Sequence, residues 1–408
     1  VESSLESILT QIDEQTDLII IDSGSSDGSY EYLKAFANSN NINFYSKDKI
    51  LTEIIDWVYE NFAEKYKYIM RVDADDLISK NAINILRNKI EEDKNCGSVC
   101  GSWSEIDQQS NTLNKMILDN GYATSAFHGA CTLFRSEAVK NIKFISNNVR
   151  SQDGLYTWLK IKDEWKCRTI SEIIFQYRRH NNNLSNEEER LFSGRCSAYQ
   201  AICNEKKLQI NSCAVIGYND DEIINSNEDA KKNIIRQIEY IQNCNSIENI
   251  YISSDSSIFD DLDLENYTKV SLLRRAKTAD SLVKSLQSCL NLQKKIANHS
   301  DVLLLNPLKN IWNSNFIDIG VYSKFVHSYK TVIACNLIKG TVFNEENESL
   351  KLVNFSNLNT VFTSNFLFIK LPGFLLVGAD DFYTIDDNYP KPVGHVSNNF
   401  LSLGINSF

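Results

Sequence analysis

Short apolar runs alternate with amphipathic stretches over the first 180 residues. The run "DLIIID" (Asp17–Asp22) is apolar until it closes on an acid, which is typical of a strand buried on both faces. The stretch "LTEIIDWVYENF" (Leu51–Phe62) has apolar residues at helical spacing and predicts a helix. Further strands are expected at Asn41–Ser46 and Tyr66–Val72, followed by a helix capped by Ser79. Strands that alternate with helices indicate an α/β fold with mostly parallel sheets.

The same pattern restarts after a long polar helix that we expect around Leu184–Gln209. Helices are then predicted near Asp229–Gln242 and Ala279–Ala297. The strands predicted in this half are Cys213–Tyr218, Ile247–Ser254, Lys269–Leu273, Asp301–Pro307 and Lys330–Leu337. We therefore predict two α/β domains, at residues 1–185 and 208–408, with a connecting helix at residues 186–207.

Composition narrows the class of protein. The 408 residues suggest two or three domains, and a net charge of −11 with a pI near 5.1 argues against general nucleic-acid binding. The ten cysteines are scattered, which indicates reduced cytosolic thiols and argues against a zinc site. The best apolar run, Asn365–Gly378, is too short to span a bilayer. We expect a cytoplasmic protein, with peripheral attachment at the inner membrane as the alternative.

An acidic cluster follows the third predicted strand, in "YIMRVDADD". Because ligands of parallel sheets bind beyond the carboxyl ends of the strands, Asp22 and Asp73–Asp76 are expected on one rim. Two carboxylates spaced D-x-D can share Mg²⁺ or Mn²⁺, while a substrate diphosphate supplies further oxygens. By itself this spacing is a weak signal, because acidic triplets in loops are usually only solvated.

Five motifs strengthen the signal because they occur in a recognisable order. They are "LIIIDSGSSDGSYEYL", "YIMRVDADD", "HGACTLFRSEAV", "SQDGLYTWLK" and "YRRHNNNLS". With this order, residues 1–185 resemble the family 2 glycosyltransferases of the GT-A fold. The resemblance implies transfer of a sugar, with inversion, from a nucleotide-sugar donor to a glycan or lipid-linked acceptor in surface-polysaccharide assembly. A UDP-sugar is the first choice of donor, and Mn²⁺ or Mg²⁺ is the implied cofactor.

The resemblance also implies roles for single residues. Asp22 matches the acid that contacts the base or ribose of the nucleotide, although Ser23 replaces the second acid usual beside it. Asp73 and Asp75 match the D-x-D positions for nucleotide and metal, and Asp75 is the expected direct metal ligand. His180 matches a histidine that meets the metal or the diphosphate in some members.

Asp153 matches the catalytic base, and its chemistry can also be argued directly. An attacking sugar hydroxyl must lose its proton, and a carboxylate within hydrogen-bond reach can accept it. The alternative for Asp153 is an acid that caps the following helix. His128 and Arg135 are candidates for the border of an acceptor pocket, and a structural role is the alternative for each.

One departure concerns the strand with which the family opens. The sequence begins at Val1, inside the helix expected after that strand. Either the chain is a fragment or the domain lacks its first strand, which would leave one edge of "DLIIID" exposed.

The second half resembles, more faintly, the cytidylyltransferases that activate acidic sugars. The motifs are "IENIYISSDSS", "LLRRAKTADSLVKSLQSCL" and "DVLLLNPLKNIWNSNFI", within residues 212–408. Asp255, Arg274, Arg275 and Asp280 fall at positions of that family. Acids at residues 220–222 stand where the family has a basic, glycine-rich triphosphate loop, and they would repel a triphosphate. Asp386 and Asp387 lie upstream of the place where the family has its metal pair. We therefore expect a degenerate domain that retains a role in binding, dimerisation or holding an acceptor.

Two alternative functions remain open at this point. One is a non-catalytic sugar-nucleotide-binding or scaffold protein, and the other is a bifunctional enzyme with an active C-terminal cytidylyltransferase. The sequence also leaves open the donor sugar, the acceptor, the linkage and whether the protein forms an oligomer.

Overall fold

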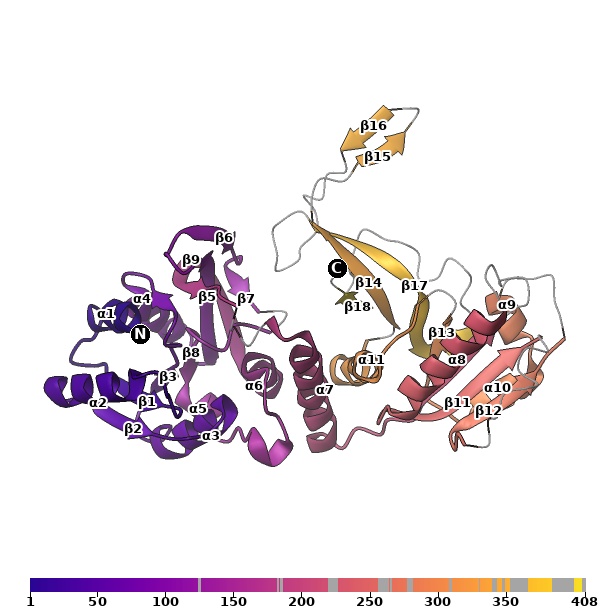
Figure 1. The fold of residues 1–408 in the computed structure, drawn as a ribbon, viewed down its shortest axis with the longest axis horizontal. Coiled ribbons are helices and arrows are strands. Elements are labelled where there is room, and N and C mark those ends of the chain that lie inside the picture. The colour runs from indigo at the N-terminus through magenta and orange to yellow at the C-terminus, as the bar shows by residue number, and fades with distance from the viewer. Residues whose placement is uncertain are drawn as a thin grey trace. The chain divides into compact units, whose positions relative to one another are not determined.

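The structure is a computed structural model of residues 1–408, and its parts are drawn in Figure 1. It describes residues 1–123, 126–181, 183, 186–218, 227–255, 264, 266–276, 282–307, 310–329, 331–339, 343–346, 349–352, 366–383 and 400–405. The chain divides into two compact units, which are described separately. The described part of the first is Val1–Ile202, and the second begins at Cys203. Helix α7 (Glu188–Glu205) lies within the predicted connecting segment.

The first unit opens with a small layer around a two-stranded parallel sheet. Strand β1 (Ile19–Asp22) pairs with β2 (Asn43–Ser46), and helices α1 (Glu2–Leu9) and α2 (Ser29–Asn40) supply apolar side chains to this layer. The buried members are Leu5, Ile20, Leu33 and Ala37. Among the described residues, β2 is the only strand that pairs with β1, so the second edge of β1 carries no described ladder.

The main sheet of the first unit has the strand order β3-β8-β5-β9-β4, with β6 added to β5 and β7 added to β9. Strands β5 and β9 run parallel, whereas every other described pair in this sheet is antiparallel. The strands are β3 (Tyr68–Met70), β4 (Leu77–Ile78), β5 (Cys96–Ile106), β6 (Thr112–Met116), β7 (Gly121–Tyr122), β8 (Leu133–Arg135) and β9 (Lys166–Arg178). The α/β class is confirmed, and the sheet is mixed rather than mostly parallel because tight connections such as Asp107–Asn111 reverse the chain.

The helices of this unit follow the apolar pattern closely. Helix α3 spans Leu51–Phe62, as predicted, and α4 (Ala82–Glu91) buries Ala82, Leu86 and Ile90 completely. The N-cap of α4 is Asn81, in a left-handed conformation, and not the predicted Ser79. The reason is a preceding turn, in which the carbonyl oxygen of Ser79 already accepts a hydrogen bond from the amide of Ala82. Three short elements complete the unit: α5 (Ser136–Val139), a 3₁₀ turn at Ile145–Asn147 and α6 (Asp153–Ile161).

The second unit contains a seven-stranded sheet with the order β12-β11-β10-β13-β17-β14-β18. Its described pairs are parallel except those of β17, which runs antiparallel to β13 and β14. The strands are β10 (Ser212–Tyr218), β11 (Ile247–Ser254), β12 (Val270–Arg274), β13 (Asp301–Leu305), β14 (Thr331–Lys339), β17 (Phe366–Gly378) and β18 (Phe400–Ile405). A hairpin, β15 (Phe343–Glu346) and β16 (Ser349–Leu352), forms a separate sheet.

Helices α8 (Asn227–Gln242) and α11 (Ser314–His327) belong to this unit, and a 3₁₀ turn lies at Asp381–Tyr383. The single long helix predicted at 279–297 is wrong. The described part of this segment forms α9 (Leu282–Gln287) and α10 (Leu290–Ile296), separated by Cys289 in an extended conformation.

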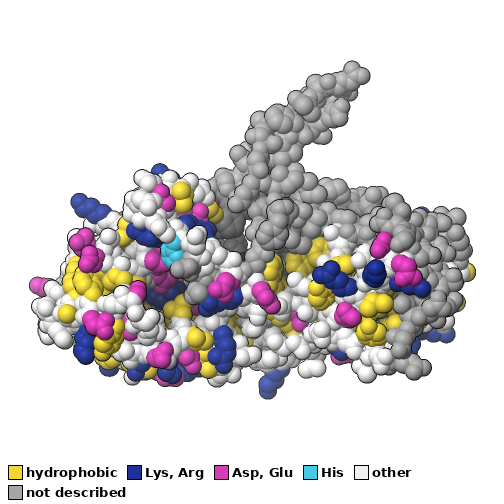
Figure 2. All heavy atoms as spheres, in the orientation of Figure 1, with side chains coloured by type: hydrophobic (Ala, Val, Ile, Leu, Met, Phe, Trp, Pro, Cys, Tyr) yellow, Lys and Arg dark blue, Asp and Glu magenta, His cyan; other side chains and the backbone are white. Residues whose placement is uncertain are grey.

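The described helices and surface also bear on membranes and nucleic acids as partners. Within the described residues, no helix combines the length and the apolar character needed to cross a bilayer. Acidic and basic side chains are interspersed over the described part of the face seen in Figure 2, which gives no support to a broad basic surface for nucleic acid.

Candidate functional site

A tight turn after β3 carries the acidic cluster. The amide of Asp76 donates to the carbonyl oxygen of Asp73 at 3.1 Å, which closes the turn. The Ser4 hydroxyl of α1 donates to the same oxygen at 3.3 Å and supports the turn from outside. The two acids of the D-x-D pair use different partners, Asp73 in one cluster and Asp75 in another.

The first cluster joins Asp73 to Asp153 through one arginine. Arg71 directs Nη1 to the carboxylate of Asp73 and Nη2 to Oδ2 of Asp153, the latter at 3.0 Å. Burial raises the pKa of Asp73, and the nearby Asp153 carboxylate acts in the same direction, while Arg71 opposes both. The structure therefore places the predicted nucleotide-side acid and the predicted base on a shared cation.

Backbone packing allows Asp153 to reach this position. Asp153 is the first residue of α6, and Gln152 before it adopts a left-handed conformation with φ 61°. A Cβ atom at Gly129 would lie 1.9 Å from Oδ2 of Asp153, so only glycine leaves room for the carboxylate. Asp153 is thus the first helical residue and not the N-cap, which is Gln152, and its side chain points to Arg71.

His128 lies beside the first cluster. Its ring packs against Phe175 and Tyr177, with centroids 5.1 and 5.2 Å away, and Asp73 and Asp153 exert electrostatic effects on it. Burial lowers the pKa of His128 below its usual value, although Asp73 acts in the opposite direction. Its Nδ1 is buried and has no hydrogen-bond partner among the described residues, as expected of a polar atom that awaits a ligand or a water.

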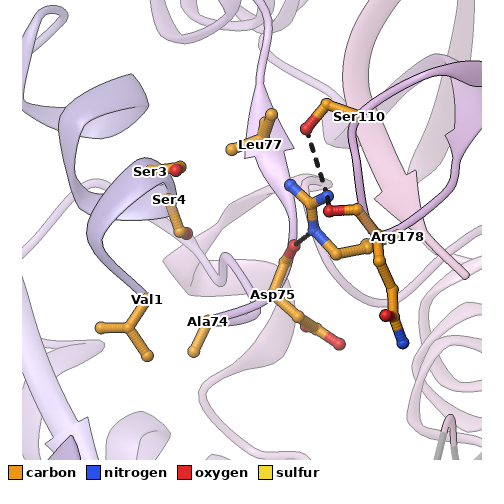
Figure 3. Close-up of a pocket in the computed structure, with 9 residues that line it drawn as sticks. Val1, Ser3, Ser4, Ala74, Asp75, Leu77, Ser110 and Arg178 are labelled. Carbon is orange, nitrogen blue, oxygen red and sulfur yellow. Dashed lines mark hydrogen bonds between the residues drawn. The ribbon is translucent and has the colours of Figure 1, made fainter. Parts of the chain in front are cut away.

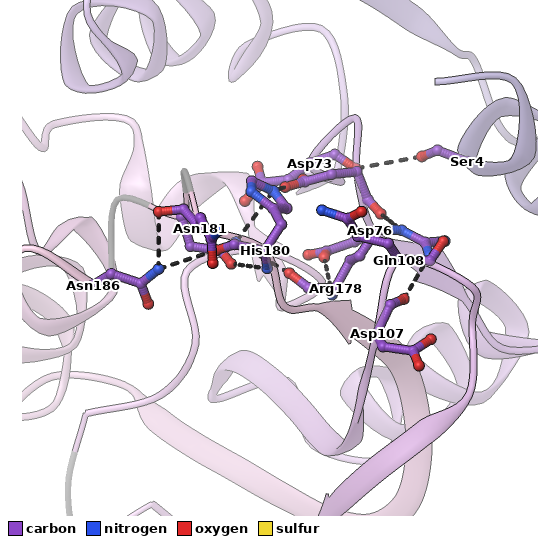
Figure 4. A network of polar contacts seen from close by, with 11 residues as sticks. Ser4, Asp73, Asp76, Asp107, Gln108, Arg178, His180, Asn181 and Asn186 are labelled. Atoms are coloured by element: carbon purple, nitrogen blue, oxygen red, sulfur yellow. Dashed lines mark hydrogen bonds and ion pairs between the residues drawn. The ribbon is translucent and has the colours of Figure 1, made fainter.

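The second cluster joins Asp75 to His180. Figure 4 shows the polar contacts around His180 and Arg178. Oδ2 of Asp75 lies 2.9 Å from Nε2 of His180. The loop that carries His180 is held by Asn183, whose side chain accepts from the His180 amide at 2.6 Å and donates to the Arg178 carbonyl at 3.0 Å. The end of β9 therefore fixes a histidine against the acidic turn.

Arg178 attaches β9 to the same turn through its backbone and its side chain. Its amide donates to Asp76 Oδ1 at 3.0 Å, and its Nε donates to the Asp75 carbonyl at 2.9 Å. Figure 3 shows the guanidinium between Asp75 and Ser110, on one side of a cavity of about 400 Å³. The cavity is lined by Val1, Ser3, Ser4, Ala74, Asp75, Leu77, Gln108, Ser110 and Arg178. Asp75 thus borders a hollow, whereas Asp22 and Asp153 are not among the residues that line it.

Asp76 is fully buried beneath the turn. Its Oδ2 has no hydrogen-bond partner among the described residues, and burial raises its pKa to about 7. Its other oxygen, Oδ1, accepts from the Arg178 amide and so joins the turn to β9.

Asp22 belongs to neither cluster. Its carboxylate, 3% exposed, accepts hydrogen bonds from the amides of Gly24 and Ser25 and thereby fixes the loop after β1. Its predicted contact with a nucleotide stays a prediction.

Arg135 also lies apart from the two clusters. Its guanidinium donates to the carbonyl oxygens of Ile90, Asp93 and Cys96, at the C-terminal end of α4. The structural alternative accounts for these contacts, and we do not place Arg135 in an acceptor pocket.

A divalent cation fits the donor set of the second cluster. Asp75 and His180 offer a carboxylate oxygen and an imidazole nitrogen side by side, a pair that Mn²⁺ accepts. No cluster of three metal-binding side chains occurs among the described residues, so a bound diphosphate and waters would supply the other ligands.

Three residues of the site escaped sequence reasoning: Arg71, Gly129 and Asn183. Arg71 stands two positions before the D-x-D pair, in what reads as a buried strand, and a charge there is the signal that could have found it. Gly129 lies in a largely apolar stretch and Asn183 in a polar one, and neither has a distinctive spacing that would single it out.

The second unit shows part of the predicted cytidylyltransferase-like positions. Asp255 and Arg275, each 3% exposed, approach to 3.5 Å at the ends of neighbouring strands. Arg274 closes β12 and is exposed. The acids at 220–222, Asp280, Asp386 and Asp387 lie outside the described residues.

Comparisons with solved structures find several remote likenesses. S. aureus TarS (residues 1–349) matches with 12% identity and a TM-score of 0.39, over 50% of this chain and 61% of that one. Its complex with UDP matches with 12% identity and a TM-score of 0.40, over 89% and 95%. The mannosyltransferase PcManGT from Pyrobaculum calidifontis, in complex with GDP-Man and Mn²⁺, gives 14% identity and a TM-score of 0.39, over 50% and 60%.

A 4-diphosphocytidyl-2C-methyl-D-erythritol synthase from Anaerococcus prevotii matches with 12% identity and a TM-score of 0.32, over 48% of this chain and 86% of that one. In the alignments with the first TarS structure and with PcManGT, this chain spans about three fifths of the relative's length. No curated protein matches the sequence.

A family comparison is more specific. Residues 1–143 match the family described as Glycosyl transferase family 2, a range that contains the turn with Asp73 and Asp75 and ends before Asp153 and His180. The N-terminal part of the chain, residues 1–143, is therefore a family 2 glycosyltransferase domain.

Proposed function

We propose that this protein transfers a sugar from a nucleotide-sugar donor, a UDP-sugar first, to a hydroxyl of a glycan or lipid-linked acceptor. The family match supports sugar transfer from a nucleotide-sugar donor, and the choice of donor and acceptor class is our own extension. The observation that carries the proposal is the pair of clusters around one turn, with Arg71 joining Asp73 to Asp153 and Asp75 contacting His180. We further propose that the reaction serves surface-polysaccharide assembly.

In this proposal Asp75 and His180 hold Mn²⁺ or Mg²⁺ together with the donor diphosphate. The ion would neutralise negative charge on the departing nucleoside diphosphate. Asp73 and Asp22 face the nucleotide, and His128, with its unsatisfied Nδ1, borders the acceptor.

Asp153 is the proposed base. The acceptor oxygen forms a bond to the anomeric carbon while the bond from that carbon to the phosphate oxygen breaks, and the hydroxyl proton passes to the Asp153 carboxylate. Attack from the face opposite the leaving group inverts the anomeric carbon. The nucleoside diphosphate leaves with the bonding electron pair.

The test combines binding and turnover on the full chain. UDP-glucose, UDP-N-acetylglucosamine and GDP-mannose are titrated calorimetrically with and without Mn²⁺, and release of the nucleoside diphosphate is followed. We expect at least one donor to bind with metal dependence and to be hydrolysed slowly. Absence of binding by every donor would contradict the proposal.

Three variants divide the roles. Asp75→Asn and His180→Ala should weaken metal-dependent donor binding, while Asp153→Asn should bind the donor normally and lose turnover. The matched control is Asp163→Asn, which removes an exposed carboxylate paired with Lys162. Donor binding that persists in Asp75→Asn without any turnover in the wild type would favour the non-catalytic alternative.

We keep the proposal that the second unit no longer makes an activated sugar. Arg275 and Asp255 lie 3.5 Å apart, so each of these charges already faces an opposite charge of the same chain. Incubation with CTP and an acidic sugar tests the point: pyrophosphate release would establish the bifunctional alternative.

A further inference from the structure

The side chain of Arg71 connects two carboxylates that lie 80 residues apart in the sequence, Asp73 and Asp153. One guanidinium nitrogen serves each acid, so a single rigid fork sets the separation of the two carboxylates. In the proposed function Asp153 is the base and Asp73 contacts the nucleotide. Arg71 therefore connects the group that activates the acceptor with the group that binds the donor.

The side chains of Arg71 and Asp153 are both restrained by their surroundings. The side chains of Arg71 and Asp153 are only 24% and 20% exposed, and the Arg71 carbonyl accepts from the Cys131 amide at 2.7 Å. Hydrogen bonds between ionised partners are among the strong ones in proteins, and partial burial reduces their screening by solvent. Gly129 lies beside the same carboxylate, so close that a Cβ atom at this position would overlap Oδ2.

The contact uses one oxygen of the base. Oδ2 of Asp153 accepts from Arg71, and no partner of Oδ1 is found among the described residues. A carboxylate with one anchored oxygen and one unengaged oxygen is suited to receive a proton in a fixed direction.

We propose that Arg71 is a positioning residue for the transfer reaction. It holds Asp153 with Oδ1 directed to the acceptor hydroxyl and ties that orientation to the D-x-D turn through Asp73. This inference rests on the proposed function, because it assigns Arg71 to the base of that same reaction.

A purely structural ion pair is the competing explanation. Such a pair would contribute to folding stability, and its loss would leave the activity of each folded molecule unchanged. A positioning role predicts a fall in kcat, because displacement of a catalytic group by about 1 Å costs on the order of 10²-fold.

The experiment compares wild type, Arg71→Lys and Arg71→Gln in the full chain, with UDP-glucose, UDP-N-acetylglucosamine and GDP-mannose plus Mn²⁺. Release of the nucleoside diphosphate gives kcat and KM, and circular dichroism gives the folded fraction. We expect Arg71→Gln to lower kcat by roughly 10²-fold with a much smaller change in donor KM. Arg71→Lys should lose less kcat than Arg71→Gln, because it keeps the positive charge. It should not reach the wild-type kcat, because an ammonium group lacks the fork that serves both acids at once. Arg87→Gln, which breaks an arginine pair with Asp13 outside the two clusters, is the matched control.

A second comparison places Arg71→Gln in the Asp153→Asn background. If Arg71 acts through Asp153, the added loss there should be under about threefold, because residues that act as a unit are not additive. An equal loss in both backgrounds would overturn the inference, and so would an Arg71→Gln protein that keeps half of the wild-type kcat. Neither result would affect the proposed function, whereas a wild type that binds and cleaves none of the donors would remove both.

Discussion

Gly129 has no Cβ atom, and this determines how closely Asp153 can approach Arg71. Glycine is the residue that allows close approach to the backbone, and the Asp153 carboxylate lies where a Cβ atom of residue 129 would stand. The position is therefore sensitive to the addition of one methyl group.

Gly129→Ala should displace the Asp153 carboxylate, because the new Cβ would lie 1.9 Å from Oδ2. We expect turnover to fall by on the order of 10²-fold while donor binding persists. Gly121→Ala is the control, since nothing lies within 4 Å of its Cβ position. Assays of nucleoside diphosphate release on both proteins measure the effect, and equal activities would refute the argument.

A second prediction at this scale concerns pH. The pKa of buried Asp76 is raised from 3.8 to about 7, so the folded protein binds this proton more tightly than the unfolded chain does. Its contribution to stability is full below pH 3.8 and is lost as the pH rises through 7, by up to about 1.4 kcal/mol per pH unit.

Asp76→Asn should flatten this slope between pH 4 and pH 7. The measurement is urea unfolding over this range with a chelator present, and Asp93→Asn is the control. The pKa of Asp93 is lowered by its hydrogen bond to Lys166, so its titration lies below this range. A slope in Asp76→Asn as steep as that of the wild type would disprove the prediction.

Part of the site was predictable from single residues. Asp73, Asp75, Asp153 and His180 were named from motifs, and the structure places them in two clusters around one turn. Arg71 was not predicted, because sequence periodicity assigns strand positions to the core and gives no reason for a charge there. Such a charge is understood only when the acids that meet it from distant segments are known.

At the scale of elements, the end of α4 shows how a loop residue can serve a helix. Helix C-termini leave carbonyl oxygens without partners within the helix, and Arg135 supplies donors to carbonyls at and just beyond this end. The cation also meets the negative end of the helix dipole.

Arg135→Gln should therefore destabilise the first unit by about 1–3 kcal/mol without changing kcat or KM. Chemical unfolding and donor turnover, measured on the same preparation, separate the two effects. A raised KM for an acceptor with unchanged stability would instead return Arg135 to the acceptor pocket.

Elements with a clear apolar period were predicted well, and α3 matches to the residue. The long strands β5 and β9 were not predicted. In β5 the sequence "CGSVCGSWSEI" is rich in small residues, which a buried strand accepts without an apolar signal. The helix predicted at 279–297 is broken at Cys289, where nothing in the sequence marks a stop. Tertiary packing decides such positions, and local pattern does not contain it.

At the scale of the whole molecule, the cysteines report on packing in both units. The nine cysteines whose side chains are described are all buried, and none of them forms a disulfide. Burial raises the pKa of Cys100 in the first unit and of Cys213 in the second to about 12, so neither forms a thiolate near neutral pH.

These nine thiols should stay unreactive towards a thiol reagent such as DTNB in the native protein and react together on unfolding. Absorbance at the two stages of the titration measures this, with the fully denatured chain as the reference. Several rapidly reacting thiols before unfolding would contradict the packing described for the two cores.

The turn after β3 has a consequence of a different kind. Asp73 and Asp75 are separated by one residue, so their Cα atoms can be at most about 7 Å apart in any conformation. The backbone between Asp73 and Asp75 thus sets an upper limit on the distance between the cluster with Arg71 and the cluster with His180. Whatever rearrangement a bound molecule causes elsewhere, the polypeptide prevents these two sides from drifting apart.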